Sequence, residues 1–191
     1  MQARSEATIK SIKAALRRLM ASRPLSEITI SEICRESGTS VGAFYHHFKS
    51  KDELFASILS STRGTLNERL RSRLTGDALR DIRQYMFLVA EKYTGIDFSY
   101  VRELYIGHIR MGQDFSQLYN SPNFILLREI IEGGQSAGQI RKDLSAEEIA
   151  EQIVMVCEGW QYTWCVNAGS YSLTEYFARH IDPVLSMIKQ P

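Results

Sequence analysis

The stretch TISEICRESGTSVGAFYHHFKSKDEL, residues 29–54, indicates two short helices joined by a tight turn. Thr29 and, three residues later, Glu32 form the pattern of a capping box, which predicts that the first of these helices begins directly after Thr29. Gly38 predicts its end, because glycine readily takes the left-handed conformation of a C-terminal cap. Ser40 is a favourable N-terminal cap for the second helix. The stretch therefore predicts a helix, a turn and a helix.

A longer helix precedes this pair and another follows it. Apolar side chains recur at helical spacing through residues 5–22, which predicts an amphipathic first helix that Pro24 ends. Phe44 and Phe48 lie four residues apart, so they share one face of the third helix and can anchor it to the helices below. Ser50 begins a fourth helix with acidic residues in its first turn. This is the layout of a helix-turn-helix, whose second short helix is held rigidly to enter a DNA major groove.

The charge of the chain is divided unevenly. Residues 1–51 hold nine Lys and Arg against four Asp and Glu, a net charge of +5, whereas the other 140 residues carry −4. This asymmetry suggests that the first part of the chain faces a polyanion, although an ordinary solvated helix face remains the alternative.

The third helix has small residues at its start and hydrogen-bond donors at its end. The small residues are Ser40, Val41, Gly42 and Ala43. Their lack of bulk lets the backbone approach base edges closely. The donors are Tyr45, His46, His47 and, further on, Lys51. Donors here suit the phosphates beside the groove. Taken singly, Tyr45 could pack on the first helix and either histidine could be a plain surface residue, but their spacing and the basic charge together favour DNA contact.

Residues 26–59 (SEITISEICRESGTSVGAFYHHFKSKDELFASIL) resemble the DNA-binding signature of the tetracycline-repressor (TetR) family of one-component bacterial regulators. The shared features are Gly38 in the turn, the run from Ser40 to Tyr45, the end of the third helix from His46 to Phe48, and the lead KSKDEL into the fourth helix. The resemblance implies a DNA-binding transcriptional regulator, expected to be a repressor.

The same resemblance assigns roles to single positions of the DNA-binding part. It implies that phosphates are contacted by Thr29, Tyr45, His47 and Lys51. It also implies that Val41, Gly42 and Ala43 face bases. Many relatives carry a basic or polar residue at position 41, and this chain has valine. Valine cannot hydrogen-bond to a base, so position 41 either contacts a thymine methyl group or contacts no base. The operator sequence therefore stays open.

Residues 50–191 are predicted to form a helical regulatory, ligand-binding and dimerisation domain, and residues 1–49 a helix-turn-helix DNA-binding domain, so the predicted fold class is all-α. Gly133, Gly134 and Gly138 indicate where order loosens. Two helices, one opened by a capping box at Ser145 and one following residue 172, close the chain. The resemblance implies that this pair forms a homodimer, as a palindromic operator requires. The alternative is that both apolar stripes fill the monomer core.

Aromatic residues are dense between positions 85 and 164, which suggests a cavity for a small, largely apolar or aromatic effector. The candidate ligand-binding residues are Tyr85, Tyr105, His108, Phe124, Glu158, Trp160, Gln161 and Trp164. His108 could equally be a hydrogen-bonded core histidine. Gly159 lies inside a helical run, where glycine costs stability, and so suggests close approach by a ligand or a second helix.

Other classes of protein find little support in the sequence. Four histidines and three cysteines show none of the spacings of a hydrolase or metal site, so no catalytic residue, metal or cofactor is predicted. Two alternatives remain: a thiol-based redox regulator acting through Cys157 and Cys165, and a constitutive DNA-binding module without a ligand.

The sequence also suggests where the protein works. Charges interrupt every apolar run of the N-terminus, and no uncharged run approaches membrane-spanning length. We therefore expect a cytoplasmic protein with no membrane partner. The sequence leaves open the identity of the effector, the operator, the regulated genes, repression versus activation, and whether ligand releases or promotes DNA binding.

Overall fold

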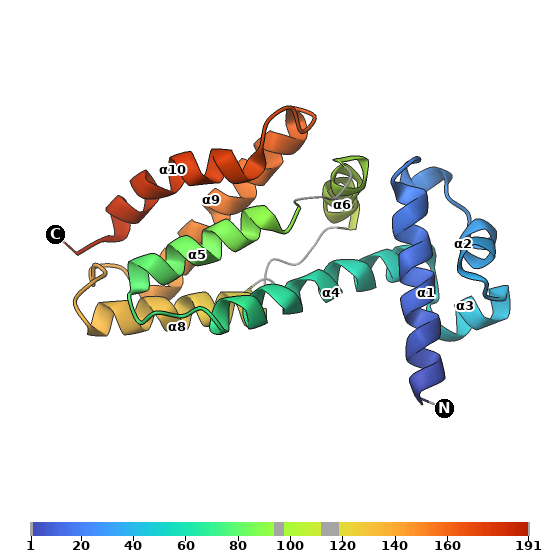
Figure 1. The fold of residues 1–191 in the computed structure, drawn as a ribbon, viewed down its shortest axis with the longest axis horizontal. Helices are drawn as coiled ribbons and strands as arrows, with labels where there is room; N and C mark the ends of the chain where they lie inside the picture. The colour runs from blue at the N-terminus through green and yellow to red at the C-terminus, as the bar shows by residue number, and fades with distance from the viewer. Residues whose placement is uncertain (1, 94–97, 112–118, 191) are drawn as a thin grey trace. The chain divides into compact units, whose positions relative to one another are not determined.

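A computed structural model of the chain describes residues 2–93, 98–111 and 119–190. Within its helices, the side chains at 2–4, 59–65, 99, 100, 104, 107, 108, 110 and 111 lie outside the description. The helices, in the order of Figure 1, are α1 (Gln2–Met20), the short 3-10 helix η1 (Leu25–Glu27), α2 (Ile30–Ser37), α3 (Val41–His47), α4 (Lys51–Arg71), α5 (Ala78–Glu91), α6 (Phe98–Met111), α8 (Pro122–Ser136), α9 (Ala146–Val166) and α10 (Leu173–Ile188). No strand occurs among the described residues, and the predicted all-α class is confirmed.

The contacts within the chain define two compact units. Unit 1 comprises Met1–Thr62 and Ile96–Met111, and unit 2 comprises Arg63–Gly95 and Gly112–Pro191. Helix α4 therefore runs from one unit into the other, and α6 belongs to unit 1. The boundary after residue 49 remains a prediction, because it divides the chain by expected function and not by contacts.

Unit 1 contains the three predicted helices of the helix-turn-helix, with α1 lying against α2 and α6, and α2 against α3. The predicted capping box is present: Thr29 caps α2 and Glu32 closes the box. Gly38 ends α2 in the left-handed conformation with φ 69°, as expected from its sequence position. The core of this unit includes the fully buried side chains of Ile12, Leu16, Met20, Ile33, Phe44, Phe55 and Ile58.

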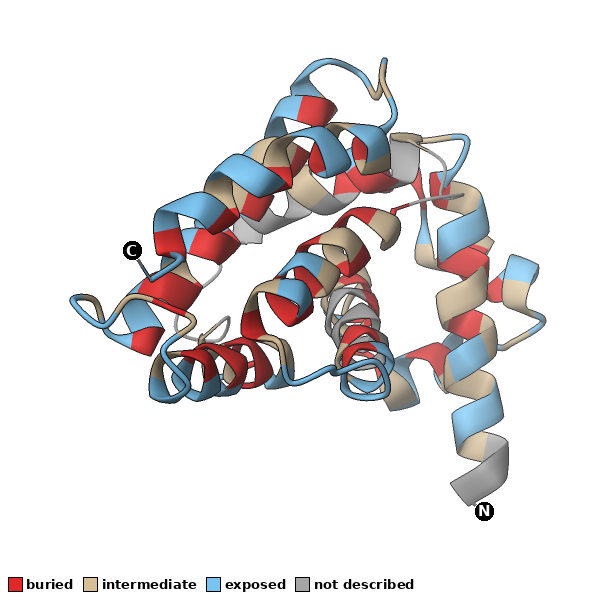
Figure 2. Cartoon of the chain, turned by 60° about the vertical axis from the view of Figure 1, so that its left-hand side comes forward, coloured by how far each residue is buried: buried red, intermediate tan, exposed pale blue. Residues whose placement is uncertain are grey.

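Unit 2 is built around α5, which contacts α8, α9 and α10. Buried residues lie along the faces of these helices that meet each other (Figure 2). A close approach occurs at Gly134 in α8, where an added Cβ would lie 2.5 Å from Cβ of Ala78 and 2.7 Å from Cδ1 of Ile140. Gly133 and Gly134 were expected to mark loosened order, but both lie inside α8, and only Gly138, at φ 72°, follows its end.

The two C-terminal helices begin where the sequence predicts. Ser145 and Glu148 form the capping box of α9. The turn between α9 and α10 is held by Trp164, whose indole N–H donates to the carbonyl of Tyr171 at 2.8 Å. Helix α10 runs through Pro183 as one helix.

Candidate DNA-binding face and effector site

The buried side of α3 sets which residues face outward. Phe44 is fully buried and Phe48 is 6% exposed, so these two side chains anchor the helix in the core of unit 1. Val41 and Tyr45 lie on the other side and are 44% and 54% exposed. The rotation of α3 about its axis is therefore set by apolar packing, and its outer face is exposed at these two positions.

Gly42 on this outer face is not required by the fold. A Cβ added there would meet no atom nearer than Oγ of Ser40, at 3.9 Å. Glycine inside a helix is about 1 kcal/mol less favourable than alanine, so an exposed helical glycine with open space around it needs an explanation from outside the chain. A partner such as DNA that must come close to this face would explain why position 42 carries no side chain.

Thr29 is engaged in the cap of α2. Its hydroxyl donates to the Glu32 carboxylate at 2.9 Å and accepts from the backbone N–H of Glu32 at 3.2 Å. The backbone N–H of Thr29, its hydroxyl and then Arg23 lower the pKa of Glu32 to about 2. The hydroxyl expected to bind phosphate thus has two partners within the chain, and its role toward DNA stays a prediction.

Lys51 also has an intramolecular role that sequence reasoning did not foresee. Its ammonium donates to the carbonyl of Leu25 and, at 2.6 Å, to the carbonyl of Ile28. Charge-assisted hydrogen bonds of this kind are stronger than neutral ones. The first residue of α4 therefore holds the turn before α2, while its predicted phosphate contact remains untested.

The same turn is also held by α6. The backbone N–H of Leu25 donates to the carboxylate of Glu103 at 3.0 Å, and Glu103 is only 5% exposed. A buried carboxylate is costly unless hydrogen-bonded, which marks this contact as a specific one. Sequence reasoning missed Glu103, because its partner is a backbone group 78 positions away.

The remaining predicted DNA-binding residues gather at the same helix. Ser40 caps α3, its hydroxyl oxygen accepting from the N–H of Ala43 at 3.1 Å. His46 is exposed and His47 half-buried, with their rings 4.9 Å apart edge to face. Together with the outer face they form one continuous stretch of α3, as the sequence predicted.

Three of the predicted effector-binding residues face the interior of unit 2. Tyr85 in α5, Phe124 in α8 and Gln161 in α9 are 6%, 1% and 1% exposed. Burial raises the pKa of the Tyr85 hydroxyl, and Cys157 and Glu158 of α9 raise it further. Two polar groups and an aromatic ring thus lie within a mostly apolar interior.

The other predicted effector residues lie elsewhere. Trp160 is half-buried against α10, where its ring centroid lies 4.8 Å from that of Phe177. Glu158 is exposed, and the indole N–H of Trp164 is used in the α9–α10 turn. On α6, in unit 1, Tyr105 is half-buried, and the side chain of His108 lies outside the described residues.

Cys157 and Cys165 lie in environments that suppress thiolate formation. Burial, with a smaller contribution from Glu158, raises the pKa of Cys157 and raises that of the half-buried Cys165 to about 11. Because the thiolate is the reactive form, both thiols are poor nucleophiles near neutral pH. Nothing in this geometry favours the redox alternative.

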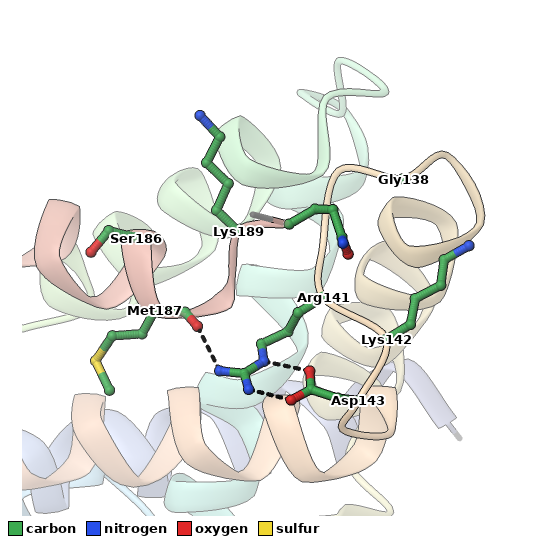
Figure 3. A pocket seen from close by; sticks show the side chains of 8 residues that line it. Gly138, Arg141, Lys142, Asp143, Ser186, Met187 and Lys189 are labelled. Carbon is green, nitrogen blue, oxygen red and sulfur yellow. Dashed lines mark hydrogen bonds and ion pairs between the residues drawn. The ribbon is translucent and has the colours of Figure 1, made fainter.

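Unit 2 holds three cavities whose linings lie wholly within the described residues, and no predicted effector residue lines any of these three. The largest of the three, 1120 Å³, lies between the α8–α9 connection and the end of α10 (Figure 3). Its Arg141 guanidinium is paired with Asp143 and donates to the carbonyl of Met187 at 3.2 Å. Lys142 and Lys189 point away from this pair, so the charges do not converge on one point.

No three His, Cys, Asp or Glu side chains within the described residues come together as ligands for a metal ion. No helix in the described ranges combines the length and the apolar character that crossing a bilayer would take.

An all-α fold whose N-terminal unit presents α3 in this way defines the class of protein: a helix-turn-helix DNA-binding protein. The comparisons with known proteins agree. Residues 12–58 match the family model for bacterial regulatory proteins of the tetR family. The HTH-type transcriptional repressor BepR of Brucella suis biovar 1 (strain 1330) is 21% identical over 200 residues, which cover 100% of this chain and 96% of BepR.

Solved structures share the fold over nearly the whole chain. The fatty acid degradation regulator FadR from Bacillus halodurans superposes with a TM-score of 0.72 and 16% identity, covering 92% of this chain and 97% of FadR. The ketosteroid transcriptional regulator KstR2 of Mycobacterium tuberculosis gives a TM-score of 0.62 and 18% identity, covering 96% and 95% of the two chains.

The resemblance to the tetR family seen in residues 26–59 is therefore confirmed for the DNA-binding part of the chain, which the family model covers. Regulators of this family bind DNA operators and act as homodimers with small-molecule effectors, and the family is not one of enzymes.

Proposed function

We propose that the chain is a repressor that binds a palindromic operator as a homodimer, and that a small apolar or aromatic effector bound in unit 2 controls this binding. The observation that carries the DNA-binding part is the outer face of α3. Phe44 and Phe48 are buried and fix the orientation of α3. Gly42 has open space beside it, so no side chain projects from the outer face at this position.

The effector part is supported by the interior of unit 2. Tyr85 and Gln161 are buried polar side chains that could orient a ligand, and Phe124 offers an aromatic wall. The names of the similar structures mention fatty acid degradation and ketosteroids, which agrees with an effector of apolar character.

The dimer part is supported by the outer side of α9. Met155, Tyr162 and Val166 are 50%, 53% and 64% exposed and recur at the spacing of one helix face. Gly159 lies within this stripe, and a Cβ added to it would meet no atom within 4 Å. An exposed apolar stripe around an open glycine suits close packing against the same stripe of a second copy.

Helix α4 is the proposed mechanical link between effector and DNA. Near its start Lys51 holds the turn before α2, and further along Asn67 donates to the carbonyl of Pro122 in unit 2 at 2.7 Å. A ligand that binds two conformations of unit 2 unequally would shift the position of α4 and so the fit of the recognition helices. Coupling of about 1–3 kcal/mol, roughly 5- to 150-fold in affinity, is typical.

The first test measures operator binding of the Gly42→Ala variant by fluorescence anisotropy on the intergenic DNA upstream of the gene, across a salt series. We expect wild type to bind selectively with a steep salt dependence. Gly42→Ala should bind at least tenfold more weakly, about 1.4 kcal/mol, because its methyl group meets the base edges. Gly133→Ala in α8, another helical glycine with open space, is the matched control and should bind like wild type. Equal affinity of Gly42→Ala and wild type would contradict the proposed face.

The dimer is tested by sedimentation equilibrium of Gly159→Leu. The leucine fits the open space of the single chain, so we expect a folded protein with at least tenfold weaker dimerisation. An unchanged dimer would place the interface elsewhere.

Effector control is tested with panels of fatty acids, steroids and aromatic carboxylic acids, followed by thermal shift and by operator anisotropy. A compound whose binding is weakened by Gln161→Leu and that changes operator affinity supports the proposal. A compound that depends on Gln161 but leaves operator affinity unchanged contradicts it.

A further inference from the structure

The outer face of α3 begins with methyl groups in place of hydrogen-bonding side chains. Val41, the first residue of the helix, is 44% exposed, and its side chain has neither donor nor acceptor. Gly42 follows with open space where a Cβ would be, and Ala43 is half-buried. The N-terminal half of α3 therefore presents an apolar surface of short side chains.

The fold does not explain an exposed valine at this position. The cap of α3 is made by the Ser40 hydroxyl, so Val41 is not needed to begin the helix. β-Branched residues also have low helix propensity, and an exposed one gains no packing energy. Its use here points to an apolar group on a partner.

The orientation of Val41 is tied to that of the whole helix. Phe44 and Phe48 are buried, and Tyr45, one turn after Val41 on the same side, is 54% exposed. A helix inserted into a major groove with Tyr45 beside the backbone therefore carries Val41 toward the base edges.

We propose that Val41 reads the 5-methyl group of a thymine in each operator half-site. The inference rests on the proposed DNA-binding function. Thymine is the one unmodified base that shows an apolar group in the major groove, and apolar side chains recognise it by contact. Gly42 and Ala43 allow the approach, because no longer side chain beside Val41 holds the backbone away from the bases.

The test removes the methyl group alone. The full-length protein selects its half-site from a random-sequence DNA library, and each thymine of the selected site is then replaced by uracil, which pairs identically but lacks the methyl group. At one thymine per half-site we expect about a fourfold loss of affinity, the fold-change that corresponds to roughly 0.8 kcal/mol for one buried methyl group. Replacement in both half-sites should give roughly the square of that factor.

Protein variants assign the methyl contact to Val41. In Val41→Ala the loss caused by uracil at that thymine should fall below about twofold, whereas Tyr45→Phe should keep the full loss as the matched control on the same face. Thermal unfolding checks that both variants are folded, as expected for exposed positions.

The possible outcomes test the thymine contact of Val41 separately from the proposed DNA-binding function. Selective operator binding with no uracil effect at any thymine, or an effect that is undiminished in Val41→Ala, overturns the assignment and leaves the DNA-binding function intact. A selected half-site without thymine overturns it as well. Absence of any sequence-selective binding contradicts the proposed function itself.

Discussion

Unit 1 and unit 2 hold their helices in place by different means. In unit 1 the turn before α2 is fixed by hydrogen bonds to its backbone: Lys51 donates to the carbonyl of Leu25, and Glu103 accepts from the N–H of the same residue. In unit 2 the positions of the helices are fixed by close apolar packing, in which Gly134 of α8 lies directly against Ala78 of α5. The first unit is therefore sensitive to the loss of single polar groups, and the second to the gain of single methyl groups.

The largest effect should come from adding one carbon to unit 2. In Gly134→Ala the new Cβ would lie within 3 Å of Ala78 and Ile140, so α8 must move away from α5. Overpacking of this kind costs about 1–3 kcal/mol, and we expect the upper end of that range in urea unfolding. Gly133→Ala, one residue earlier with open space, should be neutral or stabilising by up to about 1 kcal/mol. Equal stabilities of the two variants would contradict the conclusion that close apolar packing at Gly134 holds the helices of unit 2.

The next largest effect should come from removing one charge in unit 1. Lys51→Met keeps the length of the side chain but removes the ammonium that donates to the carbonyls of Leu25 and Ile28, at a cost of about 1.5–3 kcal/mol for charged hydrogen bonds. Lys49→Met, at an exposed side chain two residues earlier, is the control and should change stability by less than about 0.5 kcal/mol. Urea unfolding followed by circular dichroism measures both. If both variants unfold alike, the ammonium does not hold the turn.

A smaller and opposite effect is expected at the end of α9. Ala168 has a positive φ of 52°, a left-handed conformation that favours glycine. Ala168→Gly should therefore raise the free energy of unfolding by about 0.5–1 kcal/mol. Ala178→Gly, at an exposed position of α10 with ordinary helical geometry, should lower it by about 1 kcal/mol. Destabilisation by Ala168→Gly would show that this turn is not strained.

The smallest effect concerns pH and the cap of α2. The pKa of Glu32 falls from 4.5 to about 2 on folding, chiefly through the backbone N–H of Thr29. A carboxyl group with a lowered folded-state pKa stabilises when ionised, so this contribution is complete above about pH 4.5 and is lost as pH falls toward 2. The stability difference between wild type and Glu32→Gln should therefore shrink over that range in thermal unfolding. A difference independent of pH would contradict the role of the charge.

Much of the fold could be predicted because its signals are local. The capping boxes at Thr29 and Ser145 and the left-handed Gly38 depend on residues within one turn of each other. The anchoring pair Phe44 and Phe48 also follows from helical spacing alone. Such features need no knowledge of the partner element.

The parts that could not be predicted depend on partners distant in sequence. Lys51 and Glu103 both bind the backbone of Leu25, and a backbone group leaves no trace in the residue pattern. Gly134 was expected to mark loosened order, because its contact with Ala78 is visible only once α5 and α8 are packed. The packing of Trp160 on Phe177 of α10 likewise could not be predicted, and its role as a ligand contact stays a prediction.

The place of α6 has a consequence for anyone who wishes to cut this protein into exchangeable modules. Residues 96–111 belong to unit 1, although they are inserted between two segments of unit 2. A fragment that ends at residue 62 would keep the recognition helix and lose the Glu103 carboxylate, leaving the N–H of the buried Leu25 without its acceptor at a cost of about 1–3 kcal/mol. A chimera that transplants the DNA-reading specificity of this chain onto another sensor should carry α6 along with the first 62 residues.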